Sequence, residues 1–370
     1  MQRLLKLTLT QFRNYKRLVW QPDSPLLVLT GTNGSGKTNL LEAISLLSPG
    51  RGLRAAPLAQ LGRNGSTTWG ISGTFEIDGC LVEIGTGAQP GAEGARRSFL
   101  FNGRQSRSSV GWEEAPSAIW ITPQMDRLFN EGASGRRRFL DRLVIAVTPQ
   151  HARELAAYDR AMTQRNRLLQ SRFGEQAWLA ALEATMAQHA VAVAAARNDV
   201  VHLLAHYAST ALGAFPAIQI HMECPISDKL LQQPALAVED WLRTRLESLR
   251  EHDRIRGRAS FGAHRSDFML ADFQSGQHAT LASTGQQKAL LLAVILAHAR
   301  LVEDRRNTPP LLLLDEPLVH LDAGRRATLL ESVRSFHTTV IMTGTDAEPF
   351  ADLKSHARFS VLQQGAFLPS

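Results

Sequence analysis

The sequence predicts an α/β fold in which a mixed sheet lies beside an antiparallel β lobe and a helical hairpin is inserted between the two halves of the chain. Three observations lead to this prediction. The apolar run Leu26 to Leu29 is followed by a glycine-rich segment and then by a helical pattern. A second apolar run, Leu311 to Leu314, ends in two acidic residues and has the composition of a buried strand. Between the two runs, residues 136–215 carry apolar side chains at helical spacing.

Residues 1–122 have the pattern of strands, with one helix after the glycine-rich segment. The first strand is expected from Leu4 to Leu9. The dipeptides Asp78-Gly79 and Asn102-Gly103 favour tight primed turns, so each should join the two strands of a hairpin. These hairpins predict the antiparallel sheet beside the mixed one.

The helical stretch predicts two long helices that pack as an antiparallel pair. A break near Ser171 to Gly174 should turn the second helix back on the first, and Gly213 to Pro216 should end it. A strand at 217–222 and a helix at 237–250 then return the chain to the second half. The outer faces of the two helices are expected to carry these arginines, either solvated or in contact with DNA: Arg137, Arg138, Arg142, Arg160, Arg165 and Arg167.

The glycine-rich segment has the pattern GxxxxGKT, which in a strand-loop-helix setting predicts a nucleotide site. Glycines let backbone N–H groups converge on phosphate oxygens, Lys37 adds a charge toward the β- and γ-phosphates, and the Thr38 hydroxyl is placed to ligate magnesium. The expected nucleotide-binding residues of this loop are Gly31, Thr32, Asn33, Gly34, Ser35, Gly36, Lys37 and Thr38.

The acidic end of the leucine strand suits metal-assisted hydrolysis of ATP. Asp315 can hold the shell of Mg²⁺ together with Thr38, and Glu316 is positioned to act as the general base on the attacking water. The expected catalytic residues are therefore Glu316 and Lys37. The alternative interpretation is a strand whose acidic end faces solvent or caps the next turn.

A third segment, Leu281 to Lys288, opens the helical stretch from Ala289 to Leu301. Ser283, Gly285 and Gln286 would lie at a helix N-terminus, where a hydroxyl, free N–H groups and the helix dipole suit a γ-phosphate. Taken alone, the same residues are also an ordinary helix cap.

Together the three segments resemble those of ABC-type ATPases, and the resemblance implies an ABC-type P-loop head with an inserted helical arm. Residues 1–124 and 251–370 would form the head and residues 125–250 the arm. In such ATPases the signature of one subunit closes on the nucleotide of another, which implies a homodimer with two composite sites. Asp322 corresponds to a loop that crosses this dimer seam. Gly344 and Thr345 stand where transporters of the superfamily have a switch histidine.

The composition is that of an ordinary globular chain of 370 residues with 44% hydrophobic residues. Two distant cysteines support neither a disulfide framework nor a metal clasp and indicate a cytoplasmic location. We expect no membrane-spanning helix, because the longest apolar stretch, Ala289 to Ala297, is about half the length required. The net charge of +7 is compatible with an acidic partner such as DNA.

Several further segments resemble the RecF family of bacterial recombination mediators. These segments are Gln11 to Tyr15, Asn39 to Ile44, Ser48 to Arg51, Arg136 to Asp141 and Gly262 to Asp267, together with the regions of Ser283 and Asp315. The resemblance implies dimerisation with ATP on gapped or duplex DNA, slow DNA-dependent ATP hydrolysis, a part in recombinational repair, replication restart and the SOS response, and action with RecR and RecO to help load RecA.

Four additional positions have an open role. Gln124 could join the lobes as a superfamily glutamine does, or it could be incidental. His264 and Arg265 could reach a phosphate, or they could form a buried salt bridge between lobes. Arg13 and Asn14 lie on a turn between the first two strands, where Arg13 could bind phosphate, stack on adenine or be structural.

Three other protein classes share parts of this pattern. The ATPase subunit of a membrane transporter has a shorter segment between the glycine-rich loop and the signature. A chromosome-organising coiled-coil ATPase needs a far longer arm than about 50 Å, the reach of roughly 35 residues per helix. An overcoming-lysogenization-defect nuclease needs a nuclease domain, and only 48 residues follow Asp322.

Overall fold

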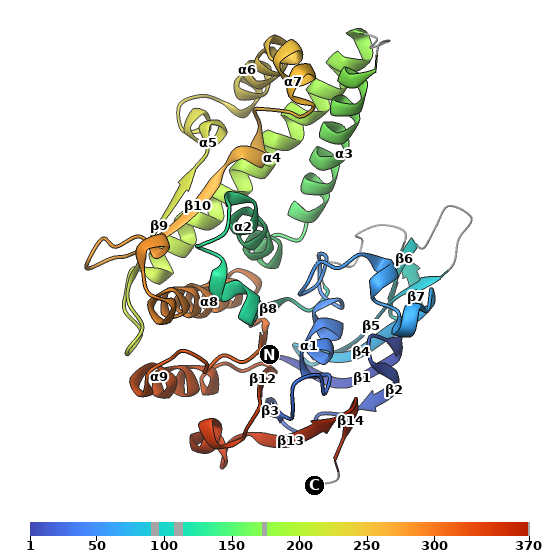
Figure 1. Ribbon diagram of the computed structural model, residues 1–370, viewed down its shortest axis with the longest axis vertical. Helices are drawn as coiled ribbons and strands as arrows, with labels where there is room; N and C mark the ends of the chain where they lie inside the picture. Colours follow the sequence, from blue (N-terminus) through green and yellow to red (C-terminus); the bar gives the residue numbers. More distant parts are fainter. Residues whose placement is uncertain (90–95, 107–113, 172–175, 369–370) are drawn as a thin grey trace. The chain divides into compact units, whose positions relative to one another are not determined.

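The computed structural model describes residues 1–89, 96–106, 114–171 and 176–368. The chain forms two compact units (Figure 1). Unit 1 consists of Met1–Asp126, Tyr207–Ile218 and Leu281–Ser370, and unit 2 of Arg127–His206 and Gln219–Thr280. The predicted division at residues 124 and 250 is not the division into these units, because residues 251–280 pack within unit 2.

Unit 1 contains a mixed sheet in which six strands are described, in the order β14-β13-β3-β12-β11-β8. The pairs among β3, β8, β11, β12 and β13 are parallel, and β14 runs antiparallel to β13. The central strands are buried on both faces, which explains their continuous apolar sequences. The strands are β3 (Leu26–Thr30), β8 (Ala118–Ile121), β11 (Leu311–Leu314), β12 (Val340–Gly344), β13 (Arg358–Gln363) and β14 (Ala366–Phe367).

The second sheet of unit 1 is antiparallel, and its described strands have the order β2-β1-β4-β5-β6-β7. Its hairpins turn at Asp78-Gly79 and Asn102-Gly103, as predicted, and all four residues have positive φ, as a primed turn requires. The strands are β1 (Gln2–Phe12), β2 (Tyr15–Trp20), β4 (Trp69–Ile77), β5 (Cys80–Gln89), β6 (Arg96–Phe101) and β7 (Arg104–Ser106).

The helix after the glycine-rich loop, α1 (Lys37–Ser45), packs between the two sheets of unit 1. Leu40, Leu41 and Ile44 are buried in one core with side chains from both sheets. Two further helices complete the unit: α8 (Thr284–Arg306), which packs on β8, and α9 (Ala323–Arg334). The 3₁₀ turns of unit 1 are η1 (Leu58–Gln60), η2 (Arg63–Gly65), η3 (Pro123–Arg127), η5 (Ala279–Leu281) and η6 (Glu348–Leu353), with η3 and η5 at the boundary with unit 2.

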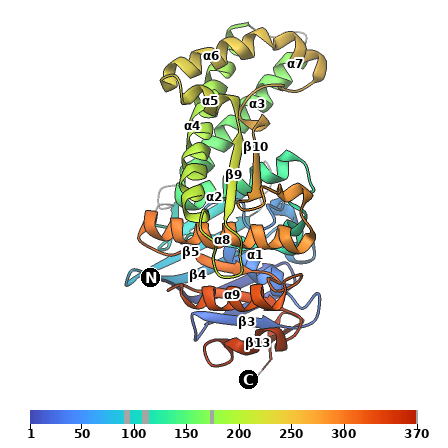
Figure 2. The same ribbon diagram turned by 90° about the vertical axis from the view of Figure 1, so that its left-hand side faces the viewer.

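Unit 2 is mostly helical, and its two strands, β9 (Ile218–Glu223) and β10 (Asp267–Asp272), run side by side along α4 (Figure 2). The two long helices predicted on either side of residue 171 are α3 and α4. The first is shorter than predicted, because Pro149 separates it from α2. The predicted break at Ser171–Gly174 lies, apart from Ser171, outside the described residues. The helices are α2 (Ala133–Val147), α3 (His151–Gln170), α4 (Gln176–Ala208), α5 (Pro225–Leu230), α6 (Ala235–Ser248) and α7 (Arg250–Arg256), with the 3₁₀ turn η4 (Ala263–Arg265).

Among the described residues, α4 is the one helix whose length and apolar composition would allow it to span a membrane. Half of its apolar window is buried inside the protein, and Met186, Ala190 and Ala194 belong to the core of unit 2. A core helix passes the same test, so this property is a weak indication of a membrane span.

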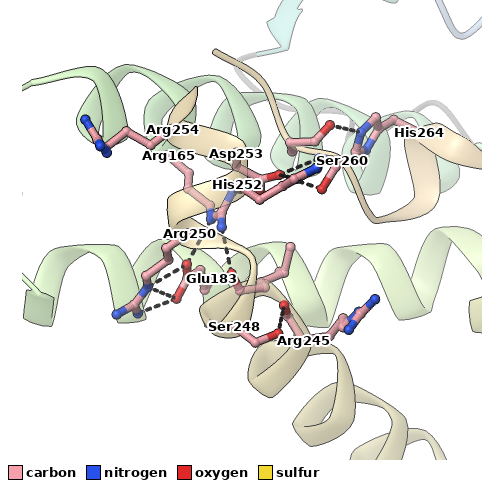
Figure 3. A network of polar contacts seen from close by, with 12 residues as sticks. Arg165, Glu183, Arg245, Ser248, Arg250, His252, Asp253, Arg254, Ser260 and His264 are labelled. Atoms are coloured by element: carbon pink, nitrogen blue, oxygen red, sulfur yellow. Dashed lines mark hydrogen bonds and ion pairs between the residues drawn. The ribbon is translucent and has the colours of Figure 1, made fainter. Parts of the chain in front are cut away.

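Arg165 was predicted to lie on the basic outer face of the helices, and this prediction was wrong. Its side chain is fully buried in unit 2, within the network of polar contacts in Figure 3. It lies on α3, and its guanidinium donates to Glu183 of α4 (2.9 Å) and to Asp253 of α7 (2.7 Å). Arg250 also pairs with Glu183, and Ser260 donates to Asp253. The network ties three helices together through the buried charges of Arg165, Glu183 and Asp253.

Replacing Arg165 by Met should destabilise unit 2 by about 3 kcal/mol, because the carboxylate of Asp253 would stay buried without its cation. Urea unfolding followed by far-UV circular dichroism measures this loss. The matched control is Arg167→Met on the same helix, which is exposed and should change the free energy of unfolding by less than about 0.5 kcal/mol. Equal stabilities of the two variants would contradict the structural role given to Arg165.

Candidate functional site

The glycine-rich loop lies between β3 and α1, and its backbone conformation requires glycine at two positions. Gly31 has a φ of 148°, and a Cβ there would lie 2.2 Å from the carbonyl oxygen of Leu362 in β13. Gly36 has a φ of 112°, and a Cβ there would lie 2.6 Å from Nδ2 of Asn14. Larger residues would therefore push the loop away from the sheet edge.

The Lys37 ammonium is folded into this loop. Its side chain is buried, and Nζ donates to the carbonyl oxygens of Gly31 (2.6 Å) and Thr32 (3.1 Å). Burial lowers the pKa of Lys37, and the negative charges of Glu316 and Asp315 oppose that shift. A cation thus lies against the backbone of the loop, within the electrostatic influence of two carboxylates.

Ser35 indicates that the loop suits an anion. Its Oγ is buried and has no hydrogen-bond partner among the described residues. A buried hydroxyl normally finds a partner, and an exception points to a ligand or water. Thr32, Asn33 and Gly34 in the same loop are exposed.

A chain of hydrogen bonds joins the loop to the acidic end of β11. Thr38 Oγ1 donates to Asp315 Oδ2 (2.8 Å), although 277 positions separate the two residues. Thr343 Oγ1 of β12 donates to Asp315 Oδ1 (2.6 Å) and accepts from the backbone N–H of Glu316 (3.1 Å). A hydroxyl and a carboxylate side by side are hard oxygen ligands of the kind that Mg²⁺ takes beside phosphate. The residues therefore fit a magnesium ion.

Glu316 is held in an unusual backbone conformation. Its φ is 49°, in the left-handed region, which costs a residue other than glycine about 1–2 kcal/mol. Such outliers persist where the surroundings enforce them, and they gather at functional sites. Glu316 is partly exposed to solvent.

The signature residues form the start of α8. Ser283 and Gln286 make a capping box: Ser283 N–H donates to Gln286 Oε1 (2.9 Å), and Gln286 N–H donates to Ser283 Oγ (3.4 Å). The helix-cap interpretation of this segment therefore holds in the free chain. A Cβ on Gly285 would lie 3.1 Å from the carbonyl oxygen of His320, so the signature packs closely against the loop that leads to Asp322.

The structure separates the roles of Arg13 and Asn14. The Arg13 guanidinium binds both carboxylate oxygens of Glu42 (2.8 and 2.7 Å) and the carbonyl oxygen of Gln60 (2.8 Å). Of the three roles left open for Arg13, the structure therefore supports the structural one, and not the binding of a phosphate or the stacking on adenine. Asn14 does reach the loop, since its Nδ2 lies 3.5 Å from the Ser35 carbonyl oxygen and its Oδ1 accepts from Asn39 (2.8 Å).

Gln124 is exposed in η3, directly after β8. His264 lies within unit 2, where its ring nitrogens bond to Tyr158 Oη (2.6 Å) and to the carbonyl oxygen of Ala259 (3.0 Å). Burial lowers the pKa of His264, so its ring is neutral near pH 7. Arg265 is exposed. The ring of His264 therefore forms hydrogen bonds within unit 2 and not the buried salt bridge that the sequence left open.

Two residues of the site were missed by sequence reasoning. Thr343 lies beside Asp315 because β12 neighbours β11 in the sheet, and strand order cannot be read from a local pattern. Tyr15 donates from Oη to the carbonyl oxygen of Gly36 (2.9 Å), and burial raises its pKa well above the usual range. The local signal for Tyr15 was its place in the segment Gln11 to Tyr15, one of the segments that carry the family resemblance.

Comparison with known proteins agrees with this geometry. Residues 3–366 match the RecF/RecN/SMC N-terminal domain. The chain is 43% identical over 99% of its length to the DNA replication and repair protein RecF of Mesorhizobium japonicum, of which it covers 97%. It is 41% identical over 98% of its length to RecF of Rhizobium meliloti, also covering 97% of that protein.

Solved structures show the same fold. A structure of the recombination mediator protein RecF with ATP, from the RecFOR pathway, aligns with a TM-score of 0.84 at 22% identity and covers 99% of each chain. An Smc head domain from Pyrococcus furiosus aligns with a TM-score of 0.53 at 16% identity, over 99% of this chain and 95% of that one.

The two sheets, the glycine-rich loop and the acidic strand define an ABC-type P-loop ATPase of the RecF/RecN/SMC class. Within that class, the chain belongs to the RecF family of DNA replication and repair proteins.

Proposed function

We propose that this protein binds and hydrolyses ATP at the glycine-rich loop. The observation that carries the proposal is the 2.8 Å bond between Thr38 and Asp315, which brings the loop and the acidic strand into one site. The loop N–H groups and the unpartnered Ser35 hydroxyl would receive the phosphates. Lys37 would exchange its two carbonyl partners for β- and γ-phosphate oxygens.

The hydrolytic step follows from the same residues. Thr38 and Asp315 would hold Mg²⁺, which when bound supplies charge neutralisation between the β- and γ-phosphates. Glu316 would orient the attacking water and accept its proton as the general base. Its backbone N–H is held by Thr343.

We further propose that ATP is sandwiched between two copies of the chain. Ser283, Gly285 and Gln286 lie at a helix N-terminus with exposed side chains at Ser283 and Gln286, so a second copy can present them to a γ-phosphate. Each copy would then supply one half of two composite sites. In the single chain Ser283 and Gln286 are hydrogen-bonded to each other in the capping box. These two hydrogen bonds would break when the dimer forms.

The membership of the RecF family and the net charge of +7 support a role on DNA. In this proposal the ATP-bound dimer grips gapped or duplex DNA through its phosphates in the cytoplasm. It acts there in recombinational repair with RecR and RecO, which help RecA to load. A solved RecF structure is described as part of the RecFOR pathway, which supports this assignment.

DNA binding should depend on ATP and fall steeply with salt. Phosphate contacts release counterions, so the logarithm of the binding constant should fall linearly with the logarithm of salt concentration, by about 0.9 per contact. Fluorescence anisotropy on gapped, duplex and single-stranded DNA, with and without ATP at two salt concentrations, measures this dependence. A DNA-binding constant that changed with neither ATP nor salt concentration would contradict a dimer that binds DNA through its phosphates.

A further inference from the structure

Lys288 is a buried cation whose role the ATPase site leaves unexplained. It lies on the second turn of α8, directly after the signature, and its side chain is 1% exposed. Its ammonium contacts two groups far away in the sequence. Nζ lies 3.1 Å from Asp126 Oδ2 in η3 and donates to the backbone carbonyl oxygen of Glu316 (3.2 Å).

The second contact completes a clamp on the Glu316 residue. Thr343 Oγ1 accepts from the Glu316 N–H (3.1 Å), and Lys288 donates to the Glu316 carbonyl oxygen (3.2 Å). Both backbone groups of the residue are therefore held by side chains from other elements, β12 and α8. Because Glu316 has a φ of 49°, a conformation that needs enforcement, the two side chains hold its backbone in that conformation.

We propose that Lys288 is a positioning residue that couples the signature helix to the hydrolytic carboxylate of Glu316. A shift of α8 when its start engages nucleotide would move Nζ, and with it the peptide that carries Glu316. Asp126 holds the ammonium in place through their 3.1 Å ion pair. The inference rests on the proposed function, in which Glu316 is the general base.

The coupling predicts an effect on turnover with no effect on nucleotide affinity. Lys288 touches neither the loop nor its lysine, so removing it should leave the Kd for a non-hydrolysable ATP analogue unchanged. A small misplacement of a catalytic group costs up to about 100-fold in rate. We therefore expect kcat to fall about 100-fold when the Lys288 ammonium is removed.

The test uses the full chain and the double variant Lys288→Met/Asp126→Asn. Lys288→Met alone would leave Asp126 as a buried, unpaired charge, and a loss of folding would then hide the effect on turnover. Asp126→Asn alone keeps the bond from Lys288 to Glu316 but leaves the buried ammonium without its carboxylate, so its unfolding midpoint should fall while the folded protein retains most of kcat. Arg300→Met is the matched control, because Arg300 is exposed on the same helix.

Three measurements are made on each variant: kcat, analogue Kd and the thermal unfolding midpoint. The proposal requires the double variant to lose kcat with unchanged Kd and midpoint. It is overturned if the double variant keeps its kcat, if Asp126→Asn loses as much, or if the double variant unfolds while Arg300→Met stays folded. Glu316→Gln separates this proposal from the proposed function, because a normal kcat in that variant would refute the general base itself.

Discussion

Glu316→Gln should lower kcat for ATP hydrolysis by about 10²–10⁴-fold, the contribution typical of a general base, while ATP binding is retained. Glutamine has the size of glutamate and can still orient a water molecule, but it cannot take the proton. The backbone clamp from Thr343 does not depend on the carboxylate, so the fold should be unaffected. Steady-state phosphate release and analogue binding measure the two quantities separately.

The control for this variant is Glu331→Gln on α9, which is exposed and lies outside the proposed site. It should hydrolyse ATP at the wild-type rate. If Glu316→Gln kept the wild-type kcat as well, another group would have to activate the water, and the assignment of the acidic strand would be wrong.

Lys37→Ala should abolish nucleotide binding at micromolar protein concentrations. Two hydrogen bonds from an ammonium to phosphate oxygens contribute about 1.5–3 kcal/mol each, so their loss should raise Kd by at least about 100-fold. Isothermal titration with an ATP analogue measures the change. Lys37 also donates to the carbonyl oxygens of Gly31 and Thr32, so the unfolding midpoint is recorded beside the Kd.

Lys354→Ala is the matched control, because Lys354 is exposed in unit 1 and should leave the Kd unchanged. An unchanged Kd in Lys37→Ala would show that the glycine-rich loop is not the phosphate site. A higher Kd together with an unchanged midpoint would place the effect on the nucleotide rather than on the fold.

Local patterns were enough to predict the two strands that carry the site and the loop between strand and helix. The GxxxxGKT segment and the leucine strand that ends in acidic residues are each recognisable from a stretch of about ten residues. The antiparallel hairpins were also predictable, because Asp78-Gly79 and Asn102-Gly103 impose the primed turns on their own.

The rest depended on neighbours that the sequence does not reveal. The position of Thr343 follows from strand order, and the burial of Arg165 follows from two carboxylates on other helices. Arginines on helices usually face solvent, so a buried one was read as part of a basic face. The sequence likewise left the role of Arg13 open among phosphate, adenine and structure, because its ion pair with Glu42 is a contact between distant segments.

The central claim is that ATP joins two copies of this chain through the signature at the start of α8. The measurement that tests it most directly is multi-angle light scattering of Glu316→Gln with ATP and magnesium. We predict twice the 40.7 kDa of one chain with ATP and a single chain without it, and a single chain that still binds ATP when Ser283→Arg is added. A Glu316→Gln chain that binds ATP and stays single would contradict the account.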